Sequence, residues 1–270
     1  MICLSSVLHL RDTKRTNPNL VCNNSLASLN LQAIFKFDSM ASVSTGLFRS
    51  SLGRKYLMAL SGLFLCLFLV VHLIGNLQLF AGDGGQAFNV YTYFMTHNPL
   101  IKIVAYVNYA FILLHVIDGL MLSLQNRKAR PQPYAKVNQS GSATWSSRNM
   151  GILGTVILVF LVVHMKSFWF EMKFGNMPVT SYAGDPKEYK DMYTIVVAAF
   201  GQLWYVALYV LSMFAIAFHL YHGFQSGFQS IGLNHHRYMP VIKGIGMVVF
   251  SILIPALFAA MPIFFYLKSL

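Results

Sequence analysis

The chain has 270 residues, of which 56% are hydrophobic and only 10% are charged. Because ordinary soluble domains carry about 25% charged residues, this composition excludes a soluble globular protein and indicates a membrane protein. The net charge of +12 does not indicate a nucleic-acid partner, because the charges lie outside the apolar runs, as in loops that face an anionic membrane surface.

The N-terminal residues 1–48 form a polar extension, and residues 49–270 carry the apolar runs of a membrane domain. Residues 1–39 lack the compact apolar core and the small-residue cleavage site of a bacterial signal peptide. They fit either an organellar transit peptide or an upstream segment that is not part of the mature protein, with Met40 as the true start. We favour the second interpretation.

Five apolar runs follow, each close to or above the length of about 20 residues that a membrane-spanning helix needs. The sequence therefore predicts an all-α integral membrane bundle of five transmembrane helices. The fourth run is long enough to tilt or to project beyond the bilayer as one helix. The runs are Tyr56–Phe80, Ile101–Leu124, Met150–Phe170, Tyr193–Phe228 and Ile245–Leu267.

Basic loops alternate with neutral or mixed loops along the chain. The first, third and fifth polar segments carry Arg49, Arg54, Lys55, Arg127, Lys128, Arg130, Lys136, Arg148, Arg237 and Lys243. The intervening segments either contain only Asp83 or mix acids with lysines. The positive-inside rule then predicts a cytoplasmic N-terminus and an outside C-terminus, in the inner (cytoplasmic) membrane of the cell.

A five-residue pattern, F-L-V-V-H, occurs twice inside apolar runs. Its copies end at His72 in the first run and at His164 in the third, and a glycine lies ten residues upstream of each, Gly62 and Gly154. An ionisable residue inside a membrane span is costly and usually functional. The repetition therefore predicts that the first and third helices supply a matched pair of histidines.

The second and fourth runs share a different pattern, H-x-x-x-G. It places Gly119 after His115 and Gly223 after His219. Each of the four histidines lies past the middle of its helix in chain direction, and successive helices run in opposite directions. His72 and His164 therefore lie toward the outside, and the other two toward the cytoplasm, at levels roughly 10–20 Å apart.

Two histidine pairs at two levels predict two bis-imidazole haem groups stacked across the bilayer, because haem iron accepts two axial imidazoles. Zinc prefers four ligands at one level. The glycines at positions 62, 119, 154 and 223 would leave room for the porphyrin edges, although small residues also serve helix packing in membranes. His222 is an alternative to His219, which we prefer because it preserves the match to His115.

Four stretches carry a resemblance to a known family. They are S-G-L-F-L-C-L-F-L-V-V-H (Ser61–His72), L-L-H-V-I-D-G (Leu113–Gly119), V-F-L-V-V-H (Val159–His164) and F-H-L-Y-H-G-F (Phe218–Phe224). Together they resemble the b558-type, five-helix, di-haem cytochrome b subunit of succinate dehydrogenase and fumarate reductase, from about residue 52 to the C-terminus.

This resemblance implies a quinone-reactive membrane anchor that carries electrons between an iron–sulfur subunit and membrane quinone, usually menaquinone. It implies two haem b groups, one on His72 and His164 far from the soluble subunits and one on His115 and His219 near them. The implied partners are an FAD-containing flavoprotein, where the dicarboxylate chemistry occurs, and an iron–sulfur protein, both on the cytoplasmic face. Some members have an acid where this chain has Ala217, which puts a proton path there in doubt.

Two haems that span the bilayer would be superfluous unless quinone reacts at the outer level, so the sequence predicts a quinone site there. Its polar candidates are Asn76, Gln78, His97, Lys102, Lys166 and Glu171. Candidates for holding haem propionates at the cytoplasmic end are Arg54, Trp145, Arg148, Gln225, Ser226 and Gln229. Two alternatives stay open: the di-haem cytochrome b of a hydrogenase or formate dehydrogenase, and a five-helix transporter with a histidine proton relay.

Overall fold

The computed structural model describes residues 50–129 and 144–270, and Ser51–Leu270 forms one compact unit. The predicted N-terminal extension, residues 1–48, lies outside the described residues. The prediction of an all-α bundle is confirmed, because five helices are long and apolar enough to cross a membrane, and the chain is therefore a multi-pass membrane protein. The five spans are Ser51–Phe80, Pro99–Lys128, Met150–Phe174, Leu203–Ser230 and Met239–Ser269.

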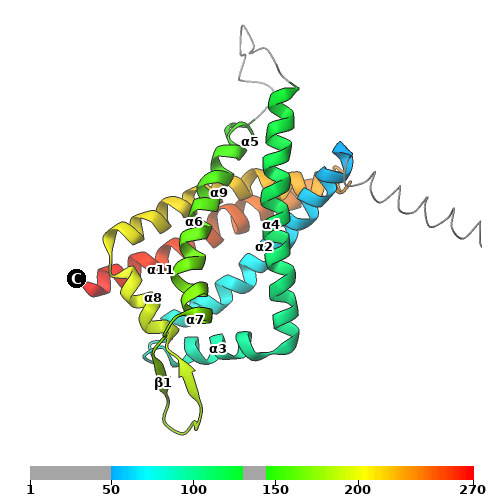
Figure 1. The fold of residues 1–270 in the computed structure, drawn as a ribbon. Coiled ribbons are helices and arrows are strands. Elements are labelled where there is room, and N and C mark those ends of the chain that lie inside the picture. Colours follow the sequence, from blue (N-terminus) through cyan, green and yellow to red (C-terminus); the bar gives the residue numbers. More distant parts are fainter. Residues whose placement is uncertain (1–49, 130–143) are drawn as a thin grey trace, which may run out of the picture. The chain divides into compact units, whose positions relative to one another are not determined.

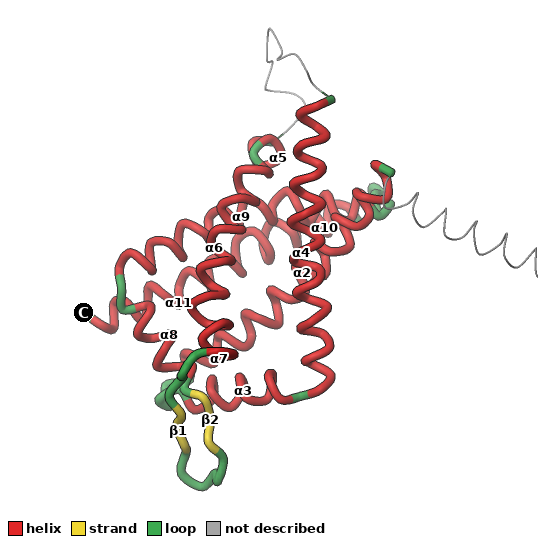
Figure 2. Tube along the Cα trace, in the orientation of Figure 1, coloured by secondary structure: helices red, strands yellow, loops and turns green. Residues whose placement is uncertain are grey.

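Helices make up nearly all of the regular structure, and one short antiparallel hairpin carries the two strands seen among the described residues (Figures 1 and 2). In chain order the elements are α2 (Ser51–Leu77), η2 (Gln78–Phe80), α3 (Gln86–His97), α4 (Pro99–Lys128), α5 (Trp145–Arg148), α6 (Met150–His164), η3 (Met165–Phe170), α7 (Glu171–Phe174), β1 (Val179–Ser181), β2 (Glu188–Lys190), α8 (Met192–Phe200), α9 (Leu203–Ser230), α10 (Met239–Ile245), η4 (Gly246–Leu253) and α11 (Ile254–Ser269).

Four of the spanning helices form a ring. Helix α2 packs against α4 and α9, and α6 packs against α9 and, less extensively, against α4. The diagonal partners, α2 with α6 and α4 with α9, do not pack extensively on each other. Helix α11 lies outside this ring against α9 and α2. The centre of the ring is therefore the place where side chains from diagonal helices meet.

The fourth apolar run is not one long helix, and that prediction is wrong. The helix ends at Phe200, and a new one begins at Leu203, because Gln202 between them has extended backbone angles (φ −104°, ψ 117°). The break lets α8 leave the direction of α9 and pack against α3, η3 and α11. The buried ring of Phe200 lies 5.2 Å from that of Tyr209 on α9, measured between ring centres.

The connection from the first span to the second is an ordered helix, α3, rather than a simple loop. Gly82, Gly84 and Gly85 have positive φ angles between 71° and 96°, which glycine adopts readily, and they turn the chain into α3. Asn98 then caps α4 by accepting hydrogen bonds from the backbone N–H groups of Leu100 and residue 101, a position where asparagine is favoured.

A cap of α3, the hairpin and α8 covers one end of the ring, which we call the hairpin end (Figure 1). Its central side chain is Asn89, which is 1% exposed. The Asn89 amide nitrogen donates to the Tyr182 hydroxyl at 2.9 Å and to Asp191 Oδ1 at 3.0 Å, and its Oδ1 accepts from the Tyr193 N–H at 3.0 Å. These bonds join α3 to the hairpin and to the start of α8. The opposite end, which contains α5, is called the α5 end.

Candidate functional site

The four histidines with repeated motifs meet in two pairs at the centre of the ring. The ring centres of His72 and His164 are 5.8 Å apart, and those of His115 and His219 are 6.2 Å apart. Each pair joins two diagonal helices, α2 with α6 and α4 with α9. These are the helices that pack least directly on each other, so imidazole rings occupy the space between them.

The pairs lie at different depths. Gly62, ten residues before His72 on α2, faces the His115 ring, because a Cβ built on Gly62 would lie 3.1 Å from His115 Cε1. Ten residues of helix correspond to about 15 Å along its axis. His72 and His164 therefore lie nearer the hairpin end, and the other pair lies nearer the α5 end. We call them the upper pair (His72, His164) and the lower pair (His115, His219).

The glycines of the two motifs occupy corresponding places. A Cβ on Gly154 would lie 4.0 Å from His219 Cε1, as one on Gly62 would lie near His115. In the same way Gly119 faces the Met58 side chain, and Gly223 faces that of Met150. Around Gly154 a Cβ would make only ordinary van der Waals contact, so close helix packing does not by itself require glycine there.

One histidine of the lower pair is anchored by a serine. His115 Nδ1 lies 3.1 Å from Ser61 Oγ, and Ser61 Oγ donates its only hydrogen to the Leu57 carbonyl at 2.7 Å. The Met58 carbonyl is a second acceptor for the same hydroxyl at 3.2 Å. When Ser61 donates to a carbonyl, it accepts from His115 Nδ1, which leaves the Nε2 lone pair of that ring available. The Nδ1 of His219, by contrast, is buried without a hydrogen-bond partner.

One histidine of the upper pair is anchored by a tyrosine. His164 Nδ1 lies 2.8 Å from the Tyr209 hydroxyl, which lies 3.3 Å from the hydroxyl of Tyr205. Both tyrosines are buried, at 6% and 4% exposure. His72 has a weaker polar neighbour, since its Nε2 lies 3.4 Å from Asn76 Nδ2, which donates to the His72 carbonyl at 2.8 Å.

Aromatic rings complete the surroundings of the upper pair. Phe68 stacks on the His72 ring with centres 5.2 Å apart, and Phe258 of α11 lies 5.7 Å away. Phe160 and Phe168 lie 5.7 and 5.4 Å from the His164 ring. These four phenylalanines make the surroundings of the upper pair apolar.

The paired imidazoles have the donor chemistry that haem iron takes from a protein, so His72 with His164 and His115 with His219 are the residues that could hold two haems. An imidazole nitrogen binds a metal at about 2 Å and lies about 1 Å from its own ring centre, so two imidazoles on opposite sides of one iron have centres roughly 6 Å apart. The observed separations of 5.8 and 6.2 Å agree with that arrangement. Within the described ranges, no group of three or more His, Cys, Asp or Glu side chains is placed to hold a metal ion.

His219, rather than His222, faces His115 across the ring. His222 is half-buried one turn further along α9. The structure therefore brings together the four histidines selected from their motifs and leaves the alternative outside the lower pair.

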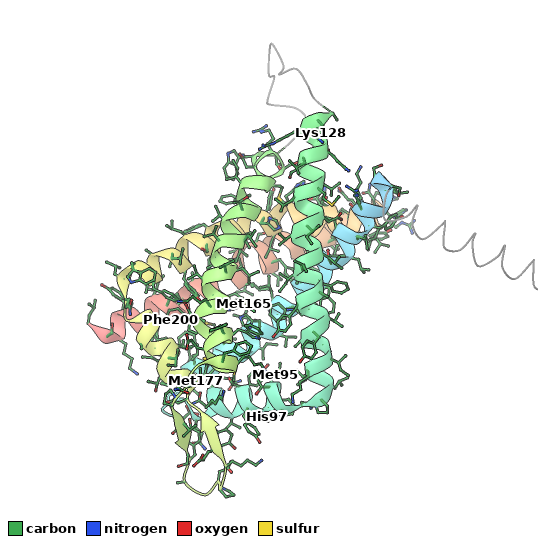
Figure 3. The ribbon with its side chains drawn as sticks, in the orientation of Figure 1. Met95, His97, Lys128, Met165, Met177 and Phe200 are labelled. Carbon is green, nitrogen blue, oxygen red and sulfur yellow. The ribbon has the colours of Figure 1, made fainter. Side chains whose placement is uncertain are left out.

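The six candidates for a quinone site do not form one cluster. Asn76 contacts His72, and Gln78 begins η2. His97 is exposed at the end of α3, where its ring stacks on Tyr93 at 3.9 Å, apart from Met165, the residue after His164 (Figure 3). Lys102 is exposed in the first turn of α4, and Glu171 begins α7. Lys166 lines a shallow pocket of about 360 Å³ with Leu161, Val162, Met165, Trp169 and Phe170.

The propionate candidates lie at the α5 end. Arg54 is half-buried in the first turn of α2, and Trp145 and Arg148 belong to α5, where the Trp145 ring packs on Phe218 at 5.4 Å. Gln225, Ser226 and Gln229 lie in the last turns of α9. Asp118 of α4 is 9% exposed, and its Oδ2 is buried without a hydrogen-bond partner.

Comparison of the chain with models of protein families, with curated proteins and with solved structures finds no match.

Proposed function

We propose that this protein is the haem b-containing, quinone-reactive membrane anchor of a succinate:quinone oxidoreductase or quinol:fumarate reductase. The observation that carries the proposal is the meeting of four motif histidines in two pairs on diagonal helices, at two depths. The sequence resemblance supplies the choice of enzyme. An FAD-containing flavoprotein and an iron–sulfur protein would bind the α5 end, which faces the cytoplasm in this proposal.

The chain would hold one haem between His72 and His164 and a second between His115 and His219. Haem supplies a carrier that takes up and releases one electron at a time. Ser61 and Tyr209 orient their histidines through Nδ1, and the phenylalanines around the upper pair keep water out. The basic residues at the α5 end, Arg54 and Arg148, would attract propionate groups.

Quinone, menaquinone in the resembling family, would react at the hairpin end beside the upper pair. Asn76 contacts His72, and Lys166 and Glu171 follow His164 along the same span. Substituting His97, Lys102 and Glu171 singly would test this placement by comparing quinone-linked turnover with dye-linked succinate oxidation. If only changes near Arg54 or Ser226 reduced quinone turnover, the site would lie at the α5 end instead.

A reduced-minus-oxidised absorption spectrum of the purified membrane protein tests the main proposal. We expect b-type bands and two haems per chain. A protein without those bands would overturn the proposal. Copurification with a flavoprotein, rather than with hydrogenase or formate dehydrogenase subunits, then identifies the enzyme.

A second candidate, a transporter with a proton relay, is favoured by one observation: the buried chain from His164 through Tyr209 to Tyr205. Proton relays in membranes use such hydrogen-bonded side chains. The same spectrum separates the two functions, because a relay has no need for haem.

A further inference from the structure

Each histidine pair contains one ring whose Nδ1 is hydrogen-bonded to a side chain and one whose Nδ1 is not bonded to a side-chain oxygen. The anchored rings are His115, through Ser61, and His164, through Tyr209. Both anchoring groups are hydroxyls, both are buried, and each comes from a neighbouring helix of the ring. Neither was selected from the sequence as a site residue.

The surroundings of Ser61 favour one tautomer of His115. The Ser61 hydroxyl lies 2.7 Å from the Leu57 carbonyl and 3.2 Å from the Met58 carbonyl, and when it donates to either of them it accepts from His115 Nδ1. At His164 the same direction is available, since the Tyr209 hydroxyl can donate to Tyr205 while it accepts from Nδ1. In both cases Nε2 is left as the metal-binding nitrogen, as in histidine ligands whose other nitrogen bonds to a protein acceptor.

The structure assigns Ser61 and Tyr209 as positioning residues that hold one ligand of each pair in its iron-binding tautomer and raise that ligand's basicity. This inference rests on the proposed haem function. A hydrogen-bonded Nδ1–H makes the imidazole a better electron donor and so favours ferric iron. Removing the acceptor oxygen therefore raises the midpoint potential of the haem concerned.

The sign of that change separates this role from a merely structural one. Loosened packing admits water, which stabilises the charged ferric form and lowers the potential. Loss of the hydrogen bond alone shifts the potential in the opposite direction. Each substitution removes a single oxygen atom and addresses one haem, so the other haem in the same molecule is an internal control.

The experiment is a redox titration of the purified full chain with its two haems, combined with low-spin EPR spectra. We expect Ser61→Ala to raise the potential of the lower haem only, and Tyr209→Phe that of the upper haem only, each with a changed low-spin signal and unchanged haem content. The matched control is Ser212→Ala, because Ser212 is a buried serine that donates to the Leu208 carbonyl at 2.7 Å in the same way. It should move neither potential.

Unchanged potentials and EPR signals in both variants, or downward shifts, would overturn the inference while leaving the haem proposal standing. A wild-type protein without haem would instead overturn the proposed function itself.

Discussion

The helix pair α2 and α4 and the helix pair α6 and α9 use one arrangement twice. In the first pair, Gly62 of α2 faces His115 of α4, and Met58, four residues before Gly62, faces Gly119 of α4. In the second pair, Gly154 of α6 faces His219 of α9, and Met150, four residues before Gly154, faces Gly223 of α9. The hydrogen bonds around the histidines differ. Ser61 precedes Gly62, whereas the corresponding residue before Gly154 is Leu153, and His219 Nδ1 is left without a partner.

At the upper pair, the side chain that bonds to a histidine Nδ1 comes from the second helix pair, α6 and α9, instead of the first. Tyr209, which bonds to His164, lies ten residues before His219, whereas the residue ten before His115 is Ala105. The repeated pattern thus sets where the rings meet, and single, unrepeated residues set how each ring is held. In the proposed cytochrome, haem position and haem potential would therefore be controlled by different residues, and the two potentials could differ although the backbone frames correspond.

The largest expected effect comes from removing one histidine of each pair, His72 of the upper pair or His115 of the lower pair. His72→Ala and His115→Ala should each lose one haem and keep the other, so that haem content falls by about half, because each leaves only one axial imidazole for one iron. Pyridine haemochrome content and low-spin EPR spectra measure this. His222→Ala is the control and should keep both haems. If both substitutions removed the same haem, the pairing would be wrong.

The hydrogen bonds between α3, which connects α2 to α4, and the hairpin with α8, which connect α6 to α9, provide the next test. We call this contact the seam between the two helix pairs. Asn89→Ala removes three hydrogen bonds that tie α3 to the hairpin and α8, and it leaves buried polar groups without partners. We expect a loss of roughly 3 kcal/mol in unfolding free energy, measured in detergent with increasing denaturant. Asn98→Ala, at the cap of α4 within the first half, should cost only about 1 kcal/mol. Equal losses of unfolding free energy in the two variants would show that the Asn89 hydrogen bonds stabilise the fold no more than a single helix cap does.

The corresponding glycines should respond differently to the same change. Gly62→Ala places a Cβ 3.1 Å from His115 Cε1, so the ring must shift, and we expect a loss of about 1 kcal/mol in stability. Gly154→Ala has room within the chain, and alanine favours helix by about 1 kcal/mol. Only a porphyrin edge would oppose it.

Thermal unfolding and haem occupancy of the two variants distinguish these causes. We expect Gly154→Ala to weaken retention of the lower haem without disturbing the helices. A Gly154→Ala protein with full haem and higher thermal stability would show that this glycine has no role in haem binding.

The smallest expected effect is a pH dependence of the stability of the hairpin end. Although burial opposes it, hydrogen bonds from Thr194 and Asn89 hold the pKa of Asp191 below its usual value, and the bond from the Tyr189 hydroxyl lowers that of Asp185. A carboxyl with a lowered folded pKa stabilises the fold fully above its unfolded pKa of about 4, and that stabilisation is lost as the pH falls through the folded pKa.

Limited proteolysis of the hairpin should therefore be unchanged between neutral pH and pH 5, within the range where both carboxyls are ionised. It should accelerate below about pH 4. Asp191→Asn should weaken this acceleration. An identical pH profile in that variant would mean that Asp191 does not link the fold to pH.

The spanning helices and the histidine pairing can be predicted from the sequence, because the length of an apolar run and a repeated motif are both visible along the chain itself. The five spans, the pairing of His72 with His164, and the place of Gly62 beside the other pair were all predicted from them. The break after Phe200 was not, since Gly201 and Gln202 sit inside an apolar run and hydropathy alone does not mark a turn. The contact of Tyr209 with His164 was also missed, because it forms between helices and leaves no spacing along the chain.

The diagonal placement of the histidines has a consequence for biosynthesis. The ligands leave the ribosome in alternating order, first an upper one, then a lower one, then the second of each. In the proposed cytochrome, no fragment of two helices can close either haem site, and the upper site is complete only when the third span has been made. Haem insertion is thereby deferred until the ring is nearly whole, and a chain stopped after α6 would carry only the upper haem.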